Sequence, residues 1–119
     1  MNEPTCTPGE LAAARKVLAL IDLFRATDPD MNMGEAVSFL VVAASDGISL
    51  SGLKTKGQFG KSSATRHAQS LGAKGGRGKR QPMGLISSRE NRLEARRKVL
   101  ELTPKGELLA QQVRHVMGL

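Results

Sequence analysis

Apolar side chains recur at helical spacing in several segments of this chain, and capping signals mark where the segments begin. The run Thr7-Pro8-Gly9-Glu10 combines an N-cap threonine, a proline at the first helical position and a glutamate three residues after the cap, which predicts the start of a helix. The helix is expected to end near Thr27, and apolar residues cover more than half of its circumference. A lone surface helix needs a narrower stripe, so we expect it also to pack against a second subunit, through Leu11, Leu18 and Ile21.

A second helix is predicted from Met33 to about Ala44. Asn32-Met33-Gly34-Glu35 is another capping box, and the helix that it opens is apolar nearly all round, which is typical of a buried helix. Asp46-Gly47 ends this helix, because glycine suits the left-handed position that follows a helix C-terminus.

Two short helices follow, joined by a glycine-containing turn. They are predicted over residues 49–56, with Ser49 as N-cap, and over residues 61–71. Such a pair makes a helix-turn-helix, which we assign to residues 48–71. The second of the two carries its small apolar residues on one side, so its other side is polar. That outward face consists of Lys61, Ser62, Ser63, Thr65, Arg66 and Gln69.

The C-terminal half predicts a loop, a β-hairpin and a last helix. Residues 73–81 are rich in glycine and basic residues, a composition that does not hold regular structure well. Strands are expected over residues 83–89 and 96–102, with a turn over residues 90–95. Thr103-Pro104 repeats the cap-then-proline start, for a helix that ends near Val116.

This order of elements predicts the fold class. A helix-turn-helix followed by a two-stranded hairpin is a winged helix, so we expect a mainly α fold with a small β-hairpin. The wing would span residues 83–102, within a single domain over residues 7–119. Residues 1–6 are expected to be disordered.

Positive charge is concentrated in the middle of the chain, whose overall net charge is +7. Residues 1–53 hold three basic and seven acidic residues, a net charge of −4, whereas residues 54–98 hold thirteen basic and two acidic ones, a net charge of +11. A basic segment that coincides with a helix-turn-helix indicates a polyanionic partner. Aromatic residues make up only 3% of the chain, which argues against the stacking platforms that bind RNA or single strands. We therefore expect double-stranded DNA; a solvated basic face is the alternative.

The polar face of the helix over residues 61–71 suits contacts with bases and phosphates. Arg66 can pair with guanine or hold a phosphate, Gln69 can reach adenine, and Thr65 can touch a thymine methyl group. The first turn of this helix offers backbone N–H groups, which favour a phosphate. Solvated polar positions on an ordinary helix are the alternative interpretation.

Two basic segments are expected to add further DNA contacts. The hairpin tip would reach the neighbouring minor groove, and the basic loop would order along the backbone and add affinity that depends on salt but not on sequence. The hairpin residues are Arg89, Asn91, Arg92, Arg96, Arg97 and Lys98. The loop residues are Lys74, Arg77, Lys79 and Arg80. A solvated wing and a solubilising linker are the alternatives.

Three stretches resemble the MarR family of bacterial regulators. They are Met31–Leu40, the helix-turn-helix Ile48–Leu71 with its segment Ser62-Ser63-Ala64-Thr65-Arg66, and Glu94-Ala95-Arg96 followed by Leu100-Glu101-Leu102-Thr103-Pro104-Lys105-Gly106. The likeness covers residues 31–110, and the Leu-Thr-Pro-Lys-Gly run is its most specific part. The chain departs from the family in its longer basic loop, its shorter last helix, and glycines at positions 57 and 60. A compact phage- or plasmid-borne relative would have these features.

The resemblance implies a homodimer held by the first and last helices, over residues 7–27 and 104–117. It also implies two recognition helices about 34 Å apart, an inverted-repeat operator, and a pair between Glu94 and Arg96 that stiffens the wing. Many members of the family bind phenolic ligands, but the scarcity of aromatic residues gives no support for an effector here. On the last helix the stripe that would join the subunit interface consists of Leu108, Leu109, Val113 and Val116.

Other chemistry finds little support in the sequence. His67 and His115 have no acidic or cysteine partner at ligand spacing, so we expect no metal, no cofactor and no enzymatic activity. Gly60-Lys61-Ser62 lacks the earlier glycine of a phosphate-binding loop, because Thr55 stands at that position. Cys6 is the only cysteine, which excludes an intramolecular disulfide. No apolar run approaches the ~20 residues of a membrane span and no signal peptide is visible, so we expect a cytoplasmic, nucleoid-associated protein without a membrane partner.

These observations predict a sequence-specific regulator of transcription, with repression as the expected outcome, that binds double-stranded DNA as a homodimer. The alternative is a non-specific architectural or counter-defence protein of a phage or mobile element, which coats DNA or binds a host regulator. A defined palindromic site favours the regulator. A steep salt dependence with little sequence preference favours the coating protein.

Overall fold

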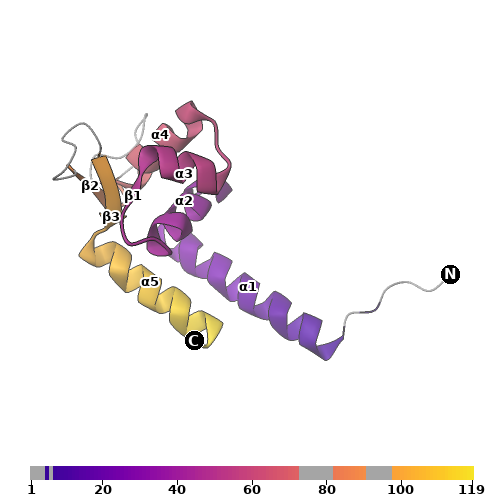
Figure 1. Cartoon of the computed structure of the whole chain (residues 1–119). Helices are drawn as coiled ribbons and strands as arrows, with labels where there is room; N and C mark the ends of the chain where they lie inside the picture. The colour runs from indigo at the N-terminus through magenta and orange to yellow at the C-terminus, as the bar shows by residue number, and fades with distance from the viewer. Residues whose placement is uncertain (1–4, 6, 73–81, 91–97) are drawn as a thin grey trace.

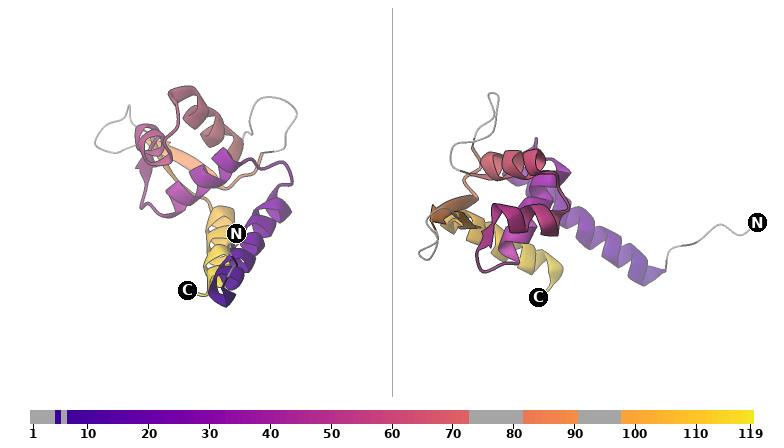
Figure 2. Two further views of the ribbon diagram at one scale, coloured as in Figure 1. Left: turned by 90° about the vertical axis from the view of Figure 1, so that its right-hand side faces the viewer. Right: turned by 45° about the horizontal axis from the view of Figure 1, so that its top comes forward.

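Five helices and three strands make up the described part of the chain, which in this computed structural model comprises residue 5 and residues 7–72, 82–90 and 98–119. The elements are α1 (Pro8–Thr27), α2 (Met33–Ala43), β1 (Ile48–Ser49), α3 (Leu50–Gly57), α4 (Lys61–Leu71), β2 (Ile86–Glu90), β3 (Lys98–Leu102) and α5 (Pro104–Met117). In Figure 1, α2, α3, α4 and the sheet form one unit, and α5 and the long α1 lie below it. Figure 2 shows α1 and α5 side by side. The fold is the winged helix-turn-helix that the sequence predicts.

Four of the five described helices begin at the N-cap side chain expected from the sequence. The side chains of Thr7, Asn32, Ser49 and Thr103 each accept a hydrogen bond from the backbone N–H three residues further on. In α1 and α2 the side chain of the glutamate three residues after the N-cap also accepts a hydrogen bond from the backbone N–H of the N-cap residue, which completes a capping box. The N-cap of α4 is Gly60, which has no side chain to offer. Because these caps involve only neighbouring residues, they fix the helix starts whatever the tertiary context.

The sheet has one strand more than the sequence predicts. Its three antiparallel strands lie in the order β1-β3-β2, and β1 consists of the two residues before α3. Ile48 of β1 and Ser88 of β2 lie opposite Leu100 from its two sides. The first wing strand begins at Ile86 rather than at residue 83, and it includes Glu90, which the sequence analysis placed in the turn. The wing is thus attached along β1 to the start of the helix-turn-helix.

One hydrophobic core joins the helices to the sheet. Phe24 of α1 packs edge-on against Phe39 of α2, with the ring centroids 5.9 Å apart and the planes at 76°. The almost entirely apolar α2 is buried at Phe39 and Val42, as its composition predicts. Leu71, at the end of α4, is fully buried. The core consists of Phe24, Phe39, Val42, Ile48, Leu53, Leu71, Met83, Leu85, Ile86, Leu100 and Leu109.

The run Leu102–Gly106 connects the wing to α5 through two close contacts. The Thr103 hydroxyl donates a hydrogen bond to the carbonyl oxygen of Gly84 at 2.6 Å and accepts one from the backbone N–H of Gly106 at 3.1 Å. A Cβ atom at Gly106 would overlap the carbonyl group of Leu85. A glycine at this position therefore allows α5 to approach the chain that enters the wing, which gives the Thr-Pro-Lys-Gly motif a packing role.

Candidate nucleic-acid interface

The outward face of α4 presents hydrogen-bond donors to solvent. Lys61, Ser62, Arg66 and Gln69 are exposed, and the opposite side of the helix is anchored by the fully buried Ala64 and Leu71. The predicted exposure is therefore confirmed for these four residues, while their contact with DNA stays a prediction. The two remaining members of the face, Ser63 and Thr65, are half-buried.

Thr65 has only part of its side chain available for a base. Its hydroxyl donates a hydrogen bond to the carbonyl oxygen of Lys61 at 3.0 Å. Bonds of this kind between a threonine and the preceding turn are common within helices. The contact of its methyl group with a thymine stays a prediction.

The first turn of α4 is open. Gly60 has extended backbone angles, φ −71° and ψ 161°, and gives the helix no side-chain cap. A Cβ atom added at Gly60 would meet nothing within 4 Å. The first N–H groups of a helix have no partner within the helix. The start of α4 is therefore accessible to an anion, whereas the starts of the other four described helices are capped by side chains.

Arg89 and Lys98 are the two predicted wing residues that fall within the described part of the chain. Both are exposed, as predicted. The guanidinium of Arg89 is bound to Glu101 on the neighbouring strand, with 2.9 Å between Nε and Oε2. Glu101 could not be identified as this partner from the sequence alone, because the pair depends on the register of the hairpin. The pair Glu94–Arg96 lies outside the described residues. So do the other predicted contact residues of the loop and wing, which are Lys74, Arg77, Lys79, Arg80, Asn91, Arg92, Arg96 and Arg97.

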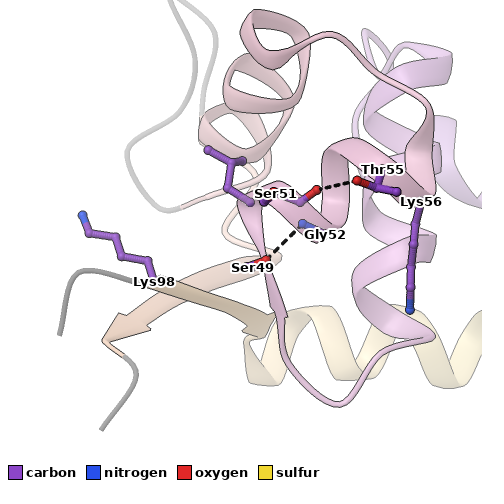
Figure 3. A pocket seen from close by; sticks show the side chains of 7 residues that line it. Ser49, Ser51, Gly52, Thr55, Lys56 and Lys98 are labelled. Atoms are coloured by element: carbon purple, nitrogen blue, oxygen red, sulfur yellow. Dashed lines mark hydrogen bonds between the residues drawn. The ribbon is translucent and has the colours of Figure 1, made fainter. Parts of the chain in front are cut away.

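A cleft of about 640 Å³ separates α3 from the base of the wing (Figure 3). Hydroxyl groups line it, but the side chains of Ser49 and Thr55 are bound within α3, to the N–H of Gly52 and the carbonyl of Ser51. The two lysines that line it extend from opposite ends and do not point toward one another. The cleft therefore does not concentrate positive charge at one point. Its residues are Ser49, Leu50, Ser51, Gly52, Thr55, Lys56 and Lys98.

The comparisons with known proteins agree on the architecture. RV1404 from Mycobacterium tuberculosis superposes with a TM-score of 0.66 at 19% sequence identity, over 89% of this chain and 67% of that one. Wild-type apo MarR from E. coli gives a TM-score of 0.63 at 17% identity, over 97% and 79% of the two chains. The chain has a MarR-like winged-helix fold.

A third structure of this MarR-like fold was solved together with DNA. S. aureus MepR, in a MepR–DNA complex, superposes with a TM-score of 0.61 at 15% identity, over 91% of this chain and 74% of that one. No protein-family model matches this chain, and no curated protein does so either.

The MarR-like fold leaves one side of α1 uncovered. Phe24 is the only residue of α1 that is buried, while Leu11, Leu18 and Ile21 are 47%, 57% and 41% exposed. The side chains of these three residues lie on one face of the helix, as their spacing predicts. A face of this kind is available to a second subunit.

On α5 the structure corrects one predicted interface residue. Leu109 is 3% exposed and belongs to the core, so it has no surface left for a partner. Leu108, the neighbouring leucine of the predicted stripe, is 57% exposed. Val113 and Val116 are half-buried. The apolar stripe of α5 is wide enough to face both the core and solvent. The sequence does not indicate which of the two leucines faces the core and which faces solvent.

Two further features concern chemistry other than DNA binding. Among residues 5, 7–72, 82–90 and 98–119, no group of three histidine, cysteine, aspartate or glutamate side chains is placed to hold a metal ion. The helices described in this structure are also too short or too polar to cross a membrane.

Burial lowers the pKa of His67 on α4 below its ordinary value. The carboxylate of Glu35 acts in the opposite direction, and the nearby Arg66 lowers the pKa further.

Proposed function

We propose that this chain is a sequence-specific regulator of transcription that binds double-stranded DNA as a homodimer. The observation that carries the proposal is the polar face of α4, whose exposed Arg66 and Gln69 stand on a helix fixed by the buried Ala64 and Leu71. The MarR-like fold supports it, since MepR, a protein of this fold, was solved in complex with DNA. In this proposal α4 enters the major groove.

We assign base recognition to the middle of α4 and phosphate binding to its start. Arg66 suits the two acceptors of guanine, and Gln69 suits adenine. The uncapped first turn offers N–H groups and the positive end of the helix dipole to one phosphate. Lys98 at the wing adds a second cationic contact to the backbone. Phosphate contacts fix the register, and base contacts specify the sequence.

The uncovered face of α1 supports a dimer. Leu18 and Ile21 are exposed on a helix of 20 residues, and contiguous apolar patches on soluble proteins mark interaction surfaces. Two copies related by a two-fold axis would present two α4 helices to one side of a duplex, so the binding site would be an inverted repeat. A dimer on such a site excludes other proteins from the same DNA, and we therefore propose repression as its effect.

Selection of binding sites from random duplexes tests this function. The wild-type protein is expected to enrich an inverted repeat, and Arg66→Ala is expected to relax the preference at one position of each half-site by about 1–3 kcal/mol. Lys105→Ala is the matched control, because this exposed lysine lies on α5, away from α4 (Figure 1). If the wild-type protein enriches no sequence, or if Arg66→Ala keeps the preference unchanged, the proposal fails.

A non-specific DNA-coating protein is the second candidate, and the charge distribution is the observation that favours it. Residues 54–98 carry a net charge of +11, which is enough for strong binding to phosphates alone. Neutralising Lys74, Arg77, Lys79 and Arg80 is expected to weaken binding to every duplex and to flatten its salt dependence. A protein that only coats DNA would show this effect without enriching any site.

A further inference from the structure

The imidazole of His67 lies directly on the backbone of α2. His67 follows Arg66 on the recognition helix α4, and it is half-buried. A Cβ atom added at Gly34, in the first turn of α2, would overlap this ring, with Cε1 only 2.6 Å away. A side chain at position 34 and the ring in its present place are therefore mutually exclusive, so Gly34 allows α4 to approach α2 through His67.

The ring of His67 also contacts Phe59, which in turn lies against a second glycine. Phe59, in the turn of the helix-turn-helix, packs edge-on against His67, with ring centroids 4.8 Å apart and planes at 63°. A Cβ atom added at Gly57, the last residue of α3, would in turn overlap Phe59 and lie 2.6 Å from its Cδ2. Gly57, Phe59, His67 and Gly34 thus form a continuous contact from α3 through α4 to α2.

The surroundings of the ring favour its neutral form. It lies at the first turn of α2, where the helix dipole is positive and a cation is unfavourable. Arg66 of α4 adds a second positive charge, and Glu35 of α2 is the carboxylate that faces the ring. Glu35 is 1% exposed and already accepts the backbone N–H of Asn32 at 3.0 Å. Burial lowers the pKa of His67 more than this carboxylate raises it.

We propose that His67 is a positioning residue of the recognition helix, and that proton uptake by its ring displaces α4 and weakens DNA binding. This inference rests on the proposed function. A proton on the ring places a cation against the positive first turn of α2 and next to Arg66, and the carboxylate of Glu35 offsets this only in part. Because Arg66 directly precedes His67 on the same helix, a movement of His67 also moves Arg66 relative to the base that it would contact.

The sign of the pH effect distinguishes this role from ordinary electrostatics. An exposed histidine that gains a proton near DNA adds a cation and strengthens binding. His67 is expected to do the opposite, since its neutral form holds the helix in place. The chain has two histidines, and His115 on α5 is exposed. The variants His67→Gln and His115→Gln are therefore a matched pair.

The experiment measures the affinity for a selected duplex by fluorescence anisotropy at about pH 7.5 and about pH 5.0, above and well below the ordinary histidine pKa, because the pKa of His67 is lowered. Wild type and His115→Gln are expected to lose several-fold in affinity at the lower pH, since a pKa difference of one unit corresponds to about tenfold in an equilibrium constant. His67→Gln is expected to lose less than twofold. Gly34→Ala, which moves the ring by steric overlap, is expected to bind weakly at both pH values.

Circular dichroism at both pH values shows whether each variant is folded, and the NMR signals of the His67 ring follow its titration in the free protein. Unchanged or tighter binding of the wild type at the lower pH would overturn the inference, and so would a loss that persists in His67→Gln. In both cases DNA binding at pH 7.5 would leave the proposed function intact. No binding at either pH would overturn both.

Discussion

Arg89 on β2 donates a hydrogen bond from Nε to Oε2 of Glu101 on β3, across the wing, at 2.9 Å. Arg89 lies opposite Val99 in the strand register, and Glu101 lies opposite Ser87, so the pair is diagonal. The two side chains are 53% and 40% exposed. The pair holds one of the wing cations against its own sheet, and this restrains the charge that the wing can offer to a phosphate.

Replacing Glu101 by glutamine is expected to strengthen DNA binding. Arg89 becomes free and one negative charge leaves the wing, so the dependence of log affinity on log salt should steepen by about one unit. Stability should change by less than about 1 kcal/mol, because exposed ion pairs contribute little. Anisotropy titrations over a series of salt concentrations measure the effect. Glu107→Gln, at an exposed position of α5, is the control; equal effects of the two substitutions would show that only total charge matters.

Closing the first turn of α4 is expected to separate stability from function. The backbone at Gly60 is open to any residue, and Gly60→Asp supplies the missing cap, which stabilises the fold by about 0.5 kcal/mol. The same carboxylate occupies the N–H groups and repels a phosphate, so DNA binding should weaken by about tenfold or more. Urea unfolding and anisotropy measure the two effects.

A serine substitution at position 60 is the control for the negative charge of Gly60→Asp. Gly60→Ser caps the helix without adding a negative charge, and its loss of affinity should be smaller than that of Gly60→Asp. If both variants bind DNA as tightly as the wild type, no phosphate lies at the start of α4.

A buried hydroxyl in α2 is expected to cost stability. Ser38 is fully buried, and its Oγ has no hydrogen-bond partner among the residues that the structure describes. Ser38→Ala should therefore raise the free energy of unfolding by about 1 kcal/mol. Ser45→Ala is the comparison, since the Ser45 hydroxyl donates to the carbonyl of Val41 at 2.7 Å. Urea denaturation that finds Ser38→Ala less stable than wild type would contradict this explanation.

A charge on the uncovered face of α1 is expected to prevent dimerisation. Leu18 is 57% exposed, and Leu18→Glu would bury a carboxylate in the proposed subunit interface, which is unfavourable. Sedimentation equilibrium should show a monomer that has lost high-affinity DNA binding, whereas Lys16→Glu, on the opposite side of the helix, should stay dimeric. A wild-type protein that is already monomeric at micromolar concentration would refute the dimer.

The fold could be predicted from sequence wherever the signal is local. The caps at Thr7, Asn32, Ser49 and Thr103 involve residues three apart, and each helix begins where its cap predicts. The strand β1 could not be predicted in this way, because two residues are too few to show an alternating pattern. Its existence depends on pairing with a segment some fifty residues away.

The site was predictable in composition but not in its contacts. The polar face of α4 follows from helical periodicity, and four of its six residues are exposed in the structure. The Arg89–Glu101 pair depends on the hairpin register, and the contact of His67 with Gly34 depends on how closely α4 packs on α2. Leu108 and Leu109 were both assigned to the interface stripe of α5, and only the packing of α5 on the core separates the exposed Leu108 from the buried Leu109.

The central claim is that Arg66 reads a base in the major groove. Its most direct test replaces each guanine of the selected site by 7-deazaguanine, which lacks the N7 acceptor that an arginine would contact, and measures the affinity of the wild type and of Arg66→Ala. One guanine in each half-site is expected to matter for the wild type by about 1–3 kcal/mol and to have no effect on Arg66→Ala. Equal sensitivity of the two proteins at every guanine would contradict the claim.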